Sequence, residues 1–161
     1  MDNKIVTTLV KTFVELGCIA IRFNFRGVGE SSGNFDEGKG EVEDVLAVVR
    51  YTESQFGKLP LILSGFSFGG YVQALVAERI HAEKLVLVAP AVGRFAMPLV
   101  PANTLLIHGE MDEVIPLSEI LAWARQQHLH IVVVPDATHF FHGFLHQLKA
   151  IVTQHFMGYN L

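Results

Sequence analysis

The decapeptide Leu61-Ile62-Leu63-Ser64-Gly65-Phe66-Ser67-Phe68-Gly69-Gly70 decides the fold of this chain. Its first half is an apolar run typical of a buried strand, and an apolar helical pattern follows it directly. Between the two, Gly65-x-Ser67-x-Gly69 predicts a strand–turn–helix bend that presents the Ser67 hydroxyl above the edge of a sheet. We expect the bend to be so tight that Gly65 and Gly69 must both lack a side chain. The backbone N–H of Phe68, at the start of the helix, is expected to favour developing negative charge.

Strand and helix patterns alternate along the rest of the chain. We expect strands over residues 18–23, 60–64, 84–88, 103–107 and 130–134, and helices over 3–16, 37–56, 69–80, 117–127 and 142–156. This alternation predicts right-handed crossovers, a mainly parallel sheet with helices on both faces, and one α/β domain over residues 1–161. Ligands of such sheets bind beyond the carboxyl ends of the strands, so we expect the functional residues at that edge.

The composition restricts the classes of partner. Half of the 161 residues are hydrophobic and the mean hydropathy is +0.37, which a parallel sheet buried on both faces explains. The longest apolar region, 85–107, is interrupted by Arg94 and three prolines, so we expect no membrane span and no membrane partner. The net charge is −4 without a basic cluster, so nucleic acid is not an expected partner. The lack of a signal-peptide pattern and the single Cys18 predict a cytoplasmic protein.

Serine is a poor nucleophile unless a base accepts its proton and an acid orients that base. Asp112 is the preferred acid because it lies in the turn after the strand expected at 103–107. Glu110, in the same turn, is the alternative acid. A solvated loop carboxylate or a helix cap is the non-catalytic interpretation of Asp112.

His139 is the preferred base because it directly follows the strand expected at 130–134 and completes the chain order Ser, Asp, His. His142 lies on the same edge and is the alternative base, although we expect it to begin the last helix. His142 and His146 stand one helical turn apart, but no carboxylate or cysteine accompanies them at the spacing of metal ligands. We therefore expect ordinary helix-surface histidines here and no metal site.

Four motifs follow one another along the chain: Asn24-Phe25-Arg26-Gly27-Val28-Gly29-Glu30-Ser31-Ser32-Gly33, Gly65-Phe66-Ser67-Phe68-Gly69-Gly70, His108-Gly109-Glu110-x-Asp112 and His139-Phe140-Phe141-His142-Gly143. With them the chain resembles small prokaryotic serine hydrolases of the α/β-hydrolase superfamily, related to dienelactone-hydrolase-like and serine-aminopeptidase-like esterases. The resemblance covers nearly the whole chain. It implies a three-layer α/β-hydrolase fold with Ser67 as nucleophile, Asp112 as acid and His139 as base. It also implies hydrolysis of a small ester or related acyl substrate through an acyl-enzyme, with the Phe68 N–H binding the oxyanion and with no cofactor.

The chain departs from this family at its amino terminus. Such hydrolases have further strands before the helix expected at 3–16, and a loop after the last of them supplies a second oxyanion N–H. We therefore expect the amino-terminal strands to be missing and Met1 to correspond to an internal methionine of a longer protein. The strands at 18–23 and 60–64 would then either pair directly or keep unpaired edges. Two other functions use the same residues: a non-catalytic or regulatory domain with a defective oxyanion hole, and a peptidase or thioesterase.

The sequence also gives expectations for the surroundings of the site, some of which leave two alternatives open. Arg26, flanked by glycines, is expected to shape the loop after the first strand rather than to contact a substrate carboxylate. The segment 90–102 lies where a lid would be inserted and is short, so we expect an open site for small substrates. Four phenylalanines fit an acyl pocket and a filled core equally well: Phe66, Phe68, Phe140 and Phe141.

Overall fold

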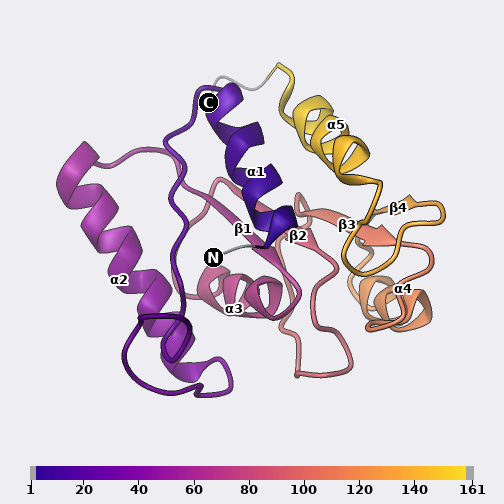
Figure 1. Cartoon of the computed structure of the whole chain (residues 1–161), viewed down its shortest axis with the longest axis horizontal. Coiled ribbons are helices and arrows are strands. Elements are labelled where there is room, and N and C mark those ends of the chain that lie inside the picture. The colour runs from indigo at the N-terminus through magenta and orange to yellow at the C-terminus, as the bar shows by residue number, and fades with distance from the viewer. Residues whose placement is uncertain (1–2, 159–161) are drawn as a thin grey trace.

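A four-stranded sheet lies at the centre of the computed structural model, which describes residues 3–158 (Figure 1). The strands are β1 (Ile62–Phe66), β2 (Lys84–Val88), β3 (Leu105–Gly109) and β4 (Ile131–Val134). They lie in the order β1-β2-β3-β4, and every neighbouring pair is parallel. The predicted α/β class with a parallel sheet is confirmed.

Helices cover both faces of this sheet. One face packs against α1 (Lys4–Glu15) and α5 (Leu145–Phe156), and the other against α2 (Lys39–Phe56), α3 (Phe68–Ala77) and α4 (Leu117–Arg125) (Figure 1). The three predicted layers are therefore confirmed.

Strand β2 shows why its sequence is apolar throughout. Val86 and Val88 belong to the core cluster beneath α1 and α5, whereas Leu85 and Leu87 belong to the cluster beneath α2, α3 and α4. Successive side chains of a strand point to opposite faces, so a strand with helices on both sides needs apolar residues at every position. The high hydropathy of the chain follows from this arrangement.

Residues 18–23 do not form a strand, so that prediction was wrong. Within the described range β1 pairs with β2 alone, and residues 18–23 join no ladder of the sheet. Cys18 and Ala20 pack against the core, whereas Ile19 and Ile21 are 51% and 42% exposed. The sequence alternation is therefore present, but a strand also needs a neighbour for its N–H and C=O groups. Of the two arrangements expected, direct pairing with β1 does not occur.

The predicted helices are confirmed, with ends that differ by up to three residues. The shift with a consequence for function is at α5, which begins at Leu145 instead of residue 142. His142 therefore lies in the turn before the helix. None of the helices within residues 3–158 combines the length and the apolar character that crossing a membrane requires.

The loop that follows the 18–23 segment is fastened to α2 by an ion pair. The Arg26 guanidinium donates to the Asp44 carboxylate at 2.8 Å, and the Arg26 backbone N–H donates to the same carboxylate at 2.9 Å. The hydrogen bond from the guanidinium lowers the pKa of Asp44, although burial opposes this. Arg26 thus shapes the loop, as predicted.

Candidate active site

Ser67 lies at the carboxyl end of β1, one residue before α3 begins. Its backbone has φ 52° and ψ −121°, a conformation that costs a residue with a side chain of the order of 1–3 kcal/mol. Hydrogen bonds hold this conformation: the Ser67 N–H donates to the Val88 carbonyl at 3.0 Å, and the Gly70 N–H donates to the Ser67 carbonyl at 2.9 Å. The predicted sharp bend is present, and strain at such a position is typical of a functional site.

Gly65 and Gly69 were both expected to have no room for a side chain, but the structure confirms this only for Gly65. A β carbon on Gly65 would lie 2.6 Å from the Gly70 nitrogen and nearer still to the Gly69 carbonyl group. A β carbon on Gly69 would meet only the Phe25 ring, at 3.9 Å, which is an ordinary contact. Gly70 is the more confined of the two helical glycines, because its β carbon would lie 3.2 Å from Pro90.

We expect Gly65→Ala to lower the free energy of unfolding by about 1–3 kcal/mol, because the new methyl group overlaps backbone atoms that cannot rotate away. Gly69→Ala is the matched control. It adds the same methyl group within α3, where alanine is a better helix former than glycine by about 1 kcal/mol, so its stability should be unchanged or higher. Urea denaturation midpoints measure both. Equal losses in the two variants would contradict this account of the bend.

Three side chains from the carboxyl edge of the sheet form a chain of hydrogen bonds. The Ser67 hydroxyl lies 3.1 Å from Nε2 of His139, and Nδ1 of His139 lies 2.8 Å from Oδ2 of Asp112. Asp112 lies in the turn after β3 and His139 in the loop after β4. His139 and Asp112 are only 2% and 6% exposed. The structure thus brings together the three residues that the sequence singled out.

The Asp112 carboxylate is fully used as a hydrogen-bond acceptor. While Oδ2 faces His139, Oδ1 accepts the backbone N–H groups of Val114 and Ile115 at 2.9 and 2.7 Å. Burial alone would raise the pKa of Asp112, but the hydrogen bonds from His139 and from these two N–H groups outweigh it, and the pKa is lowered. An ionised carboxylate accepts a hydrogen bond from the Nδ1–H of His139, which leaves Nε2 of that ring free to accept the proton of Ser67.

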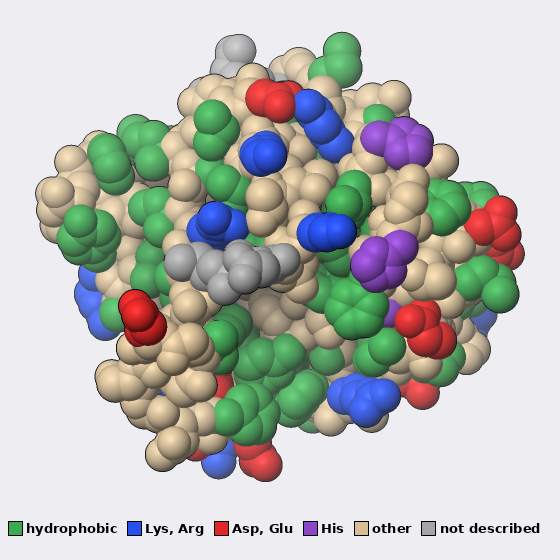
Figure 2. Space-filling view, viewed as in Figure 1, with side chains coloured by type: hydrophobic (Ala, Val, Ile, Leu, Met, Phe, Trp, Pro, Cys, Tyr) green, Lys and Arg blue, Asp and Glu red, His purple; other side chains and the backbone are tan. Residues whose placement is uncertain are grey.

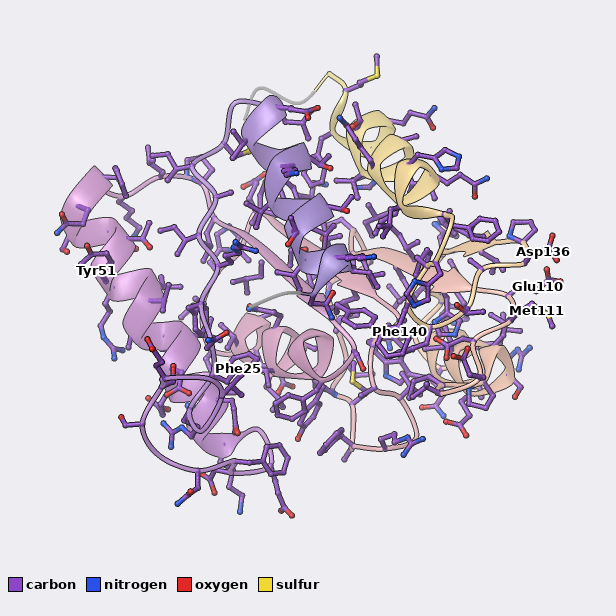
Figure 3. All side chains as sticks on the ribbon, viewed as in Figure 1. Phe25, Tyr51, Glu110, Met111, Asp136 and Phe140 are labelled. Carbon is purple, nitrogen blue, oxygen red and sulfur yellow. The ribbon has the colours of Figure 1, made fainter. Side chains whose placement is uncertain are left out.

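The alternative acid and base lie elsewhere. Glu110 is exposed, and its carboxylate accepts the Asp136 backbone N–H at 3.2 Å. Figure 3 shows Glu110 and Asp136 together at the outer edge of the molecule, away from Phe140. His142 is exposed, and its ring contacts the Phe140 ring with centroids 5.9 Å apart. Within the described residues, neither of the alternatives bonds to Ser67 or His139, and no group of three or more His, Cys, Asp and Glu could hold a metal ion.

His108 is a further residue of the site, although its place in the His108-Gly109-Glu110-x-Asp112 motif predicted no role for it. Its side chain is 0% exposed at the end of β3, with Nε2 2.9 Å from the Ile115 carbonyl and 3.5 Å from Oδ2 of Asp112. The carbonyl can only accept, so Nε2 carries the proton and donates it. His108 therefore anchors Ile115, the residue whose N–H binds Asp112. A histidine closing an apolar strand just before the acid turn was the available signal.

His108 is expected to make the protein less stable in acid. Burial lowers the pKa of its imidazole below the usual 6.5, with Asp112 and His139 as its charged or titratable neighbours. The unfolded chain then binds a proton that the folded chain does not, so this contribution to stability is complete above pH 6.5 and is lost as the pH falls toward the folded pKa.

The test is His108→Gln, because a glutamine amide retains an N–H donor for Ile115 without titrating. Urea midpoints at about pH 5.5 and about pH 7.5 should differ less in this variant than in the wild type. His108→Leu also removes the titration, but it leaves the Ile115 carbonyl without its donor and should lower stability by about 1–3 kcal/mol at both pH values. An unchanged pH dependence in both variants would exclude His108 as the source.

The Phe68 N–H was the expected oxyanion donor, and the structure shows only its position. The Phe68 N–H is the first of α3, and no hydrogen bond from it occurs within residues 3–158. The amino terminus of α1 also lies near the site, where Asn3, Lys4 and Phe140 contribute to a hollow of about 270 Å³. The Asn3 side chain, however, already accepts the first N–H groups of α1. The expectation about Met1 concerns a residue outside the described range.

Comparison with known proteins identifies the family. A sequence profile described as "Serine aminopeptidase, S33" matches residues 3–100. The chain belongs to this family. The match includes the Ser67 bend and ends before Asp112 and His139. For those two residues of this serine aminopeptidase S33 family member, the evidence is their hydrogen bonds in the structure.

Solved structures extend the likeness to nearly the whole chain. An α/β serine hydrolase without a lid from Xanthomonas campestris is 37% identical with a TM-score of 0.93, over 98% of this chain and 74% of that chain. An α/β serine hydrolase homologue from Coxiella burnetii is 41% identical with a TM-score of 0.86, over 96% and 76%. The fold is thus that of the α/β hydrolases.

A curated relative is similar over a smaller share of its own length. An uncharacterized protein of Rickettsia prowazekii is 31% identical over an alignment of 158 positions, which covers 88% of this chain and 66% of that protein. The chain therefore spans slightly less than two thirds of the length of the curated relative that it matches.

Proposed function

We propose that this protein hydrolyses a small ester or related acyl compound through an acyl-enzyme on Ser67. The observation that supports this best is the hydrogen-bonded series from the Ser67 hydroxyl through His139 to Asp112, built on a strained bend. A structural serine needs neither a positive φ nor a buried histidine–carboxylate pair beside it. The proposal also gives the buried charge of Asp112 a role.

In this mechanism, Nε2 of His139 accepts the Ser67 proton as Oγ attacks the substrate carbonyl. The negative charge that develops on the carbonyl oxygen is stabilised by the Phe68 N–H at the positive end of α3. His139 then gives its proton to the leaving alkoxide, and an ester bond to Ser67 remains. Water, deprotonated by His139, attacks this ester, and the acid product leaves with Oγ protonated again. Asp112 stabilises the imidazolium form of His139 in both steps.

We propose that the substrate is small and reaches an open site. The segment between β2 and β3 contains no helix, and the similar Xanthomonas protein is described as lacking a lid. A net charge of −4 and the absence of a basic cluster support a small-molecule substrate rather than nucleic acid. The same composition, with the single cysteine Cys18, supports the proposed cytoplasmic location and gives no support for a membrane partner.

A fluorophosphonate probe tests the nucleophile directly, because it reacts only with an activated serine. The wild type should be labelled once, at Ser67, and should hydrolyse p-nitrophenyl acetate; the Ser67→Ala variant should do neither. A folded wild-type protein that is neither labelled nor active would reject the proposal in favour of a non-catalytic domain.

A second candidate function, an aminopeptidase, is favoured by the family description alone. Amino-acid p-nitroanilides and acyl thioesters, run beside p-nitrophenyl esters on the labelled protein, compare the three activities. A kcat/KM for an amide or thioester above that for every ester would replace the esterase proposal with the corresponding activity. The labelling result would be the same in each case, since all three use one nucleophile.

A further inference from the structure

Aromatic rings form a continuous surface beside the nucleophile. The Phe68 ring, next to Ser67 in the chain, contacts Phe35 and Phe95 with centroids 5.3 Å apart in each case and Phe25 at 5.9 Å. We call this surface the aromatic wall and define it by five residues: Phe25, Phe35, Phe68, Tyr71 and Phe95. Tyr71 completes it by stacking on Phe95, with centroids 4.7 Å apart. The rings come from the 26–38 loop and its approach, from α3, and from the segment after β2.

The wall lies at the border between the core and solvent, unlike the buried phenylalanines. Phe66 and Phe141 are 8% and 0% exposed and belong to the core beneath α1 and α5. Phe25, Phe68 and Tyr71 are half-buried and pack against the core beneath α2, α3 and α4, whereas Phe35, which contacts Phe68, is 60% exposed. Figure 2 shows hydrophobic side chains gathered on the surface beside α3, and Figure 3 places Phe25 between α2 and α3. Isolated exposed apolar residues are common, but an exposed ring that continues into a group of half-buried rings gives a ligand a larger apolar surface to contact.

Phe35 is held in place by buried charge rather than by its own burial. Glu41, only 1% exposed at the start of α2, accepts the backbone N–H groups of Asp36 and Gly38 at 2.9 Å each. The base of the same loop is fixed by the pair of Arg26 with Asp44. The loop therefore presents an exposed ring from a fixed backbone, and such preorganisation reduces the entropy lost when a ligand binds.

A second exposed ring lies beside His139. Phe140 is 46% exposed, and its ring meets the His139 ring edge to face with centroids 5.1 Å apart. His139 is hydrogen-bonded to Ser67, and Ser67 is followed by Phe68 of the wall. Ser67 is therefore connected to Phe140 through His139, and to the wall through Phe68, the next residue of the chain. The five rings of the wall carry no charge themselves, and Arg26 at the base of the loop is paired with Asp44, so the wall is suited to an apolar part of a ligand.

We propose that the aromatic wall binds an aromatic ring of the substrate, so that the preferred substrates are esters carrying a phenyl-type group near the scissile bond. This inference rests on the proposed esterase function and narrows its substrate class. Aromatic rings prefer offset-stacked or edge-to-face contacts, and such a pair contributes about 0.5–1.5 kcal/mol beyond apolar area, which corresponds to about 2–12-fold in affinity. A ring can be part of either the acyl or the alcohol half, and the two halves are distinguished by experiment.

Four esters test the proposal on the full chain. Methyl phenylacetate carries the ring in its acyl half and benzyl acetate in its alcohol half; methyl cyclohexylacetate and cyclohexylmethyl acetate have a similar shape without an aromatic ring. We expect the wild-type kcat/KM to favour the phenyl member of at least one pair by about 2–12-fold. The pair that shows the preference identifies which half of the substrate contacts the wall.

Variants of Phe35 test whether the aromatic wall causes the preference for phenyl esters. Phe35→Leu keeps most of the apolar area and should reduce the phenyl-to-cyclohexyl ratio of kcat/KM to about 1, whereas Phe35→Tyr should retain the ratio. Phe56→Ala is the matched control, because Phe56 is 49% exposed at the carboxyl end of α2 and makes no ring contact with the wall. It should leave the ratio unchanged. Circular dichroism confirms that each variant is folded.

The outcomes separate this inference from the function on which it rests. If no ester is hydrolysed and the fluorophosphonate probe does not label Ser67, the esterase proposal fails. If esters are hydrolysed without any phenyl preference, or if Phe35→Leu and Phe56→Ala behave alike, the aromatic wall is not the substrate site although the esterase proposal stands.

Discussion

Replacing His139 with alanine is expected to lower kcat for p-nitrophenyl acetate by about 10⁶-fold, because a serine hydroxyl without its base is not a nucleophile at neutral pH. No other side chain among the described residues shares a hydrogen bond with the Ser67 hydroxyl, so nothing else in that range is placed to take over. Steady-state hydrolysis measures the loss. Added imidazole should restore part of the activity in this variant, since it fits the space that the ring vacates and performs the same proton transfer.

His142→Ala is the matched control, because His142 is also a histidine of the loop after β4 but is exposed and not bonded to Ser67. Its kcat should stay within about twofold of the wild-type value. A loss of activity in His142→Ala with retention in His139→Ala would reassign the base. More than a tenth of the wild-type kcat in His139→Ala would remove the proposed mechanism altogether.

The sequence was sufficient to predict the positions of those site residues that depend on local features. Ser67, Asp112 and His139 each follow a strand within a few residues, and the carboxyl ends of parallel strands meet at one edge. Their convergence could therefore be predicted without knowing any long-range contact. The preference for His139 over His142 had the same basis, since the residue closer to the strand end is the one that reaches the serine.

What the sequence did not show depends on partners distant in the chain. Residues 18–23 have the alternation of a strand, but whether a strand forms is decided by a neighbour that the local sequence does not encode. Gly69 looks as necessary as Gly65 in the motif, and only its surroundings in the fold, where a β carbon would meet just the distant Phe25 ring, show otherwise. The contact of Phe35 with Phe68 joins residues more than thirty positions apart and was likewise invisible.

Asp112→Asn is expected to lower kcat by about 10⁴-fold without unfolding the protein. Asparagine has nearly the shape of aspartate but only one acceptor oxygen and an NH₂ group that donates. Two backbone N–H groups, from Val114 and Ile115, compete with a single ring N–H for that oxygen. The oxygen should therefore stay with the backbone, which turns the amide NH₂ toward Nδ1 of His139.

This orientation forces the wrong tautomer on the base. Nδ1 must then accept from the amide, so the proton of the neutral ring moves to Nε2, the atom that faces Ser67 at 3.1 Å. A protonated Nε2 cannot accept the proton of serine, and catalysis stops although every distance is preserved. Because the pKa of Asp112 is lowered in the wild type, its carboxylate stays ionised at neutral pH, and the variant tests the loss of that charge rather than a change in its titration.

The measurement combines kinetics with the position of the ring proton. Nitrogen NMR of the neutral imidazole should report protonation at Nδ1 in the wild type and at Nε2 in Asp112→Asn, beside a kcat that is lower by about 10⁴-fold. Glu110→Gln is the control, since it removes the exposed carboxylate of the same turn, which bonds only to the Asp136 backbone, and should change neither quantity. An Asp112→Asn variant with the wild-type tautomer and full activity would show that Asp112 caps the turn and does not orient the base.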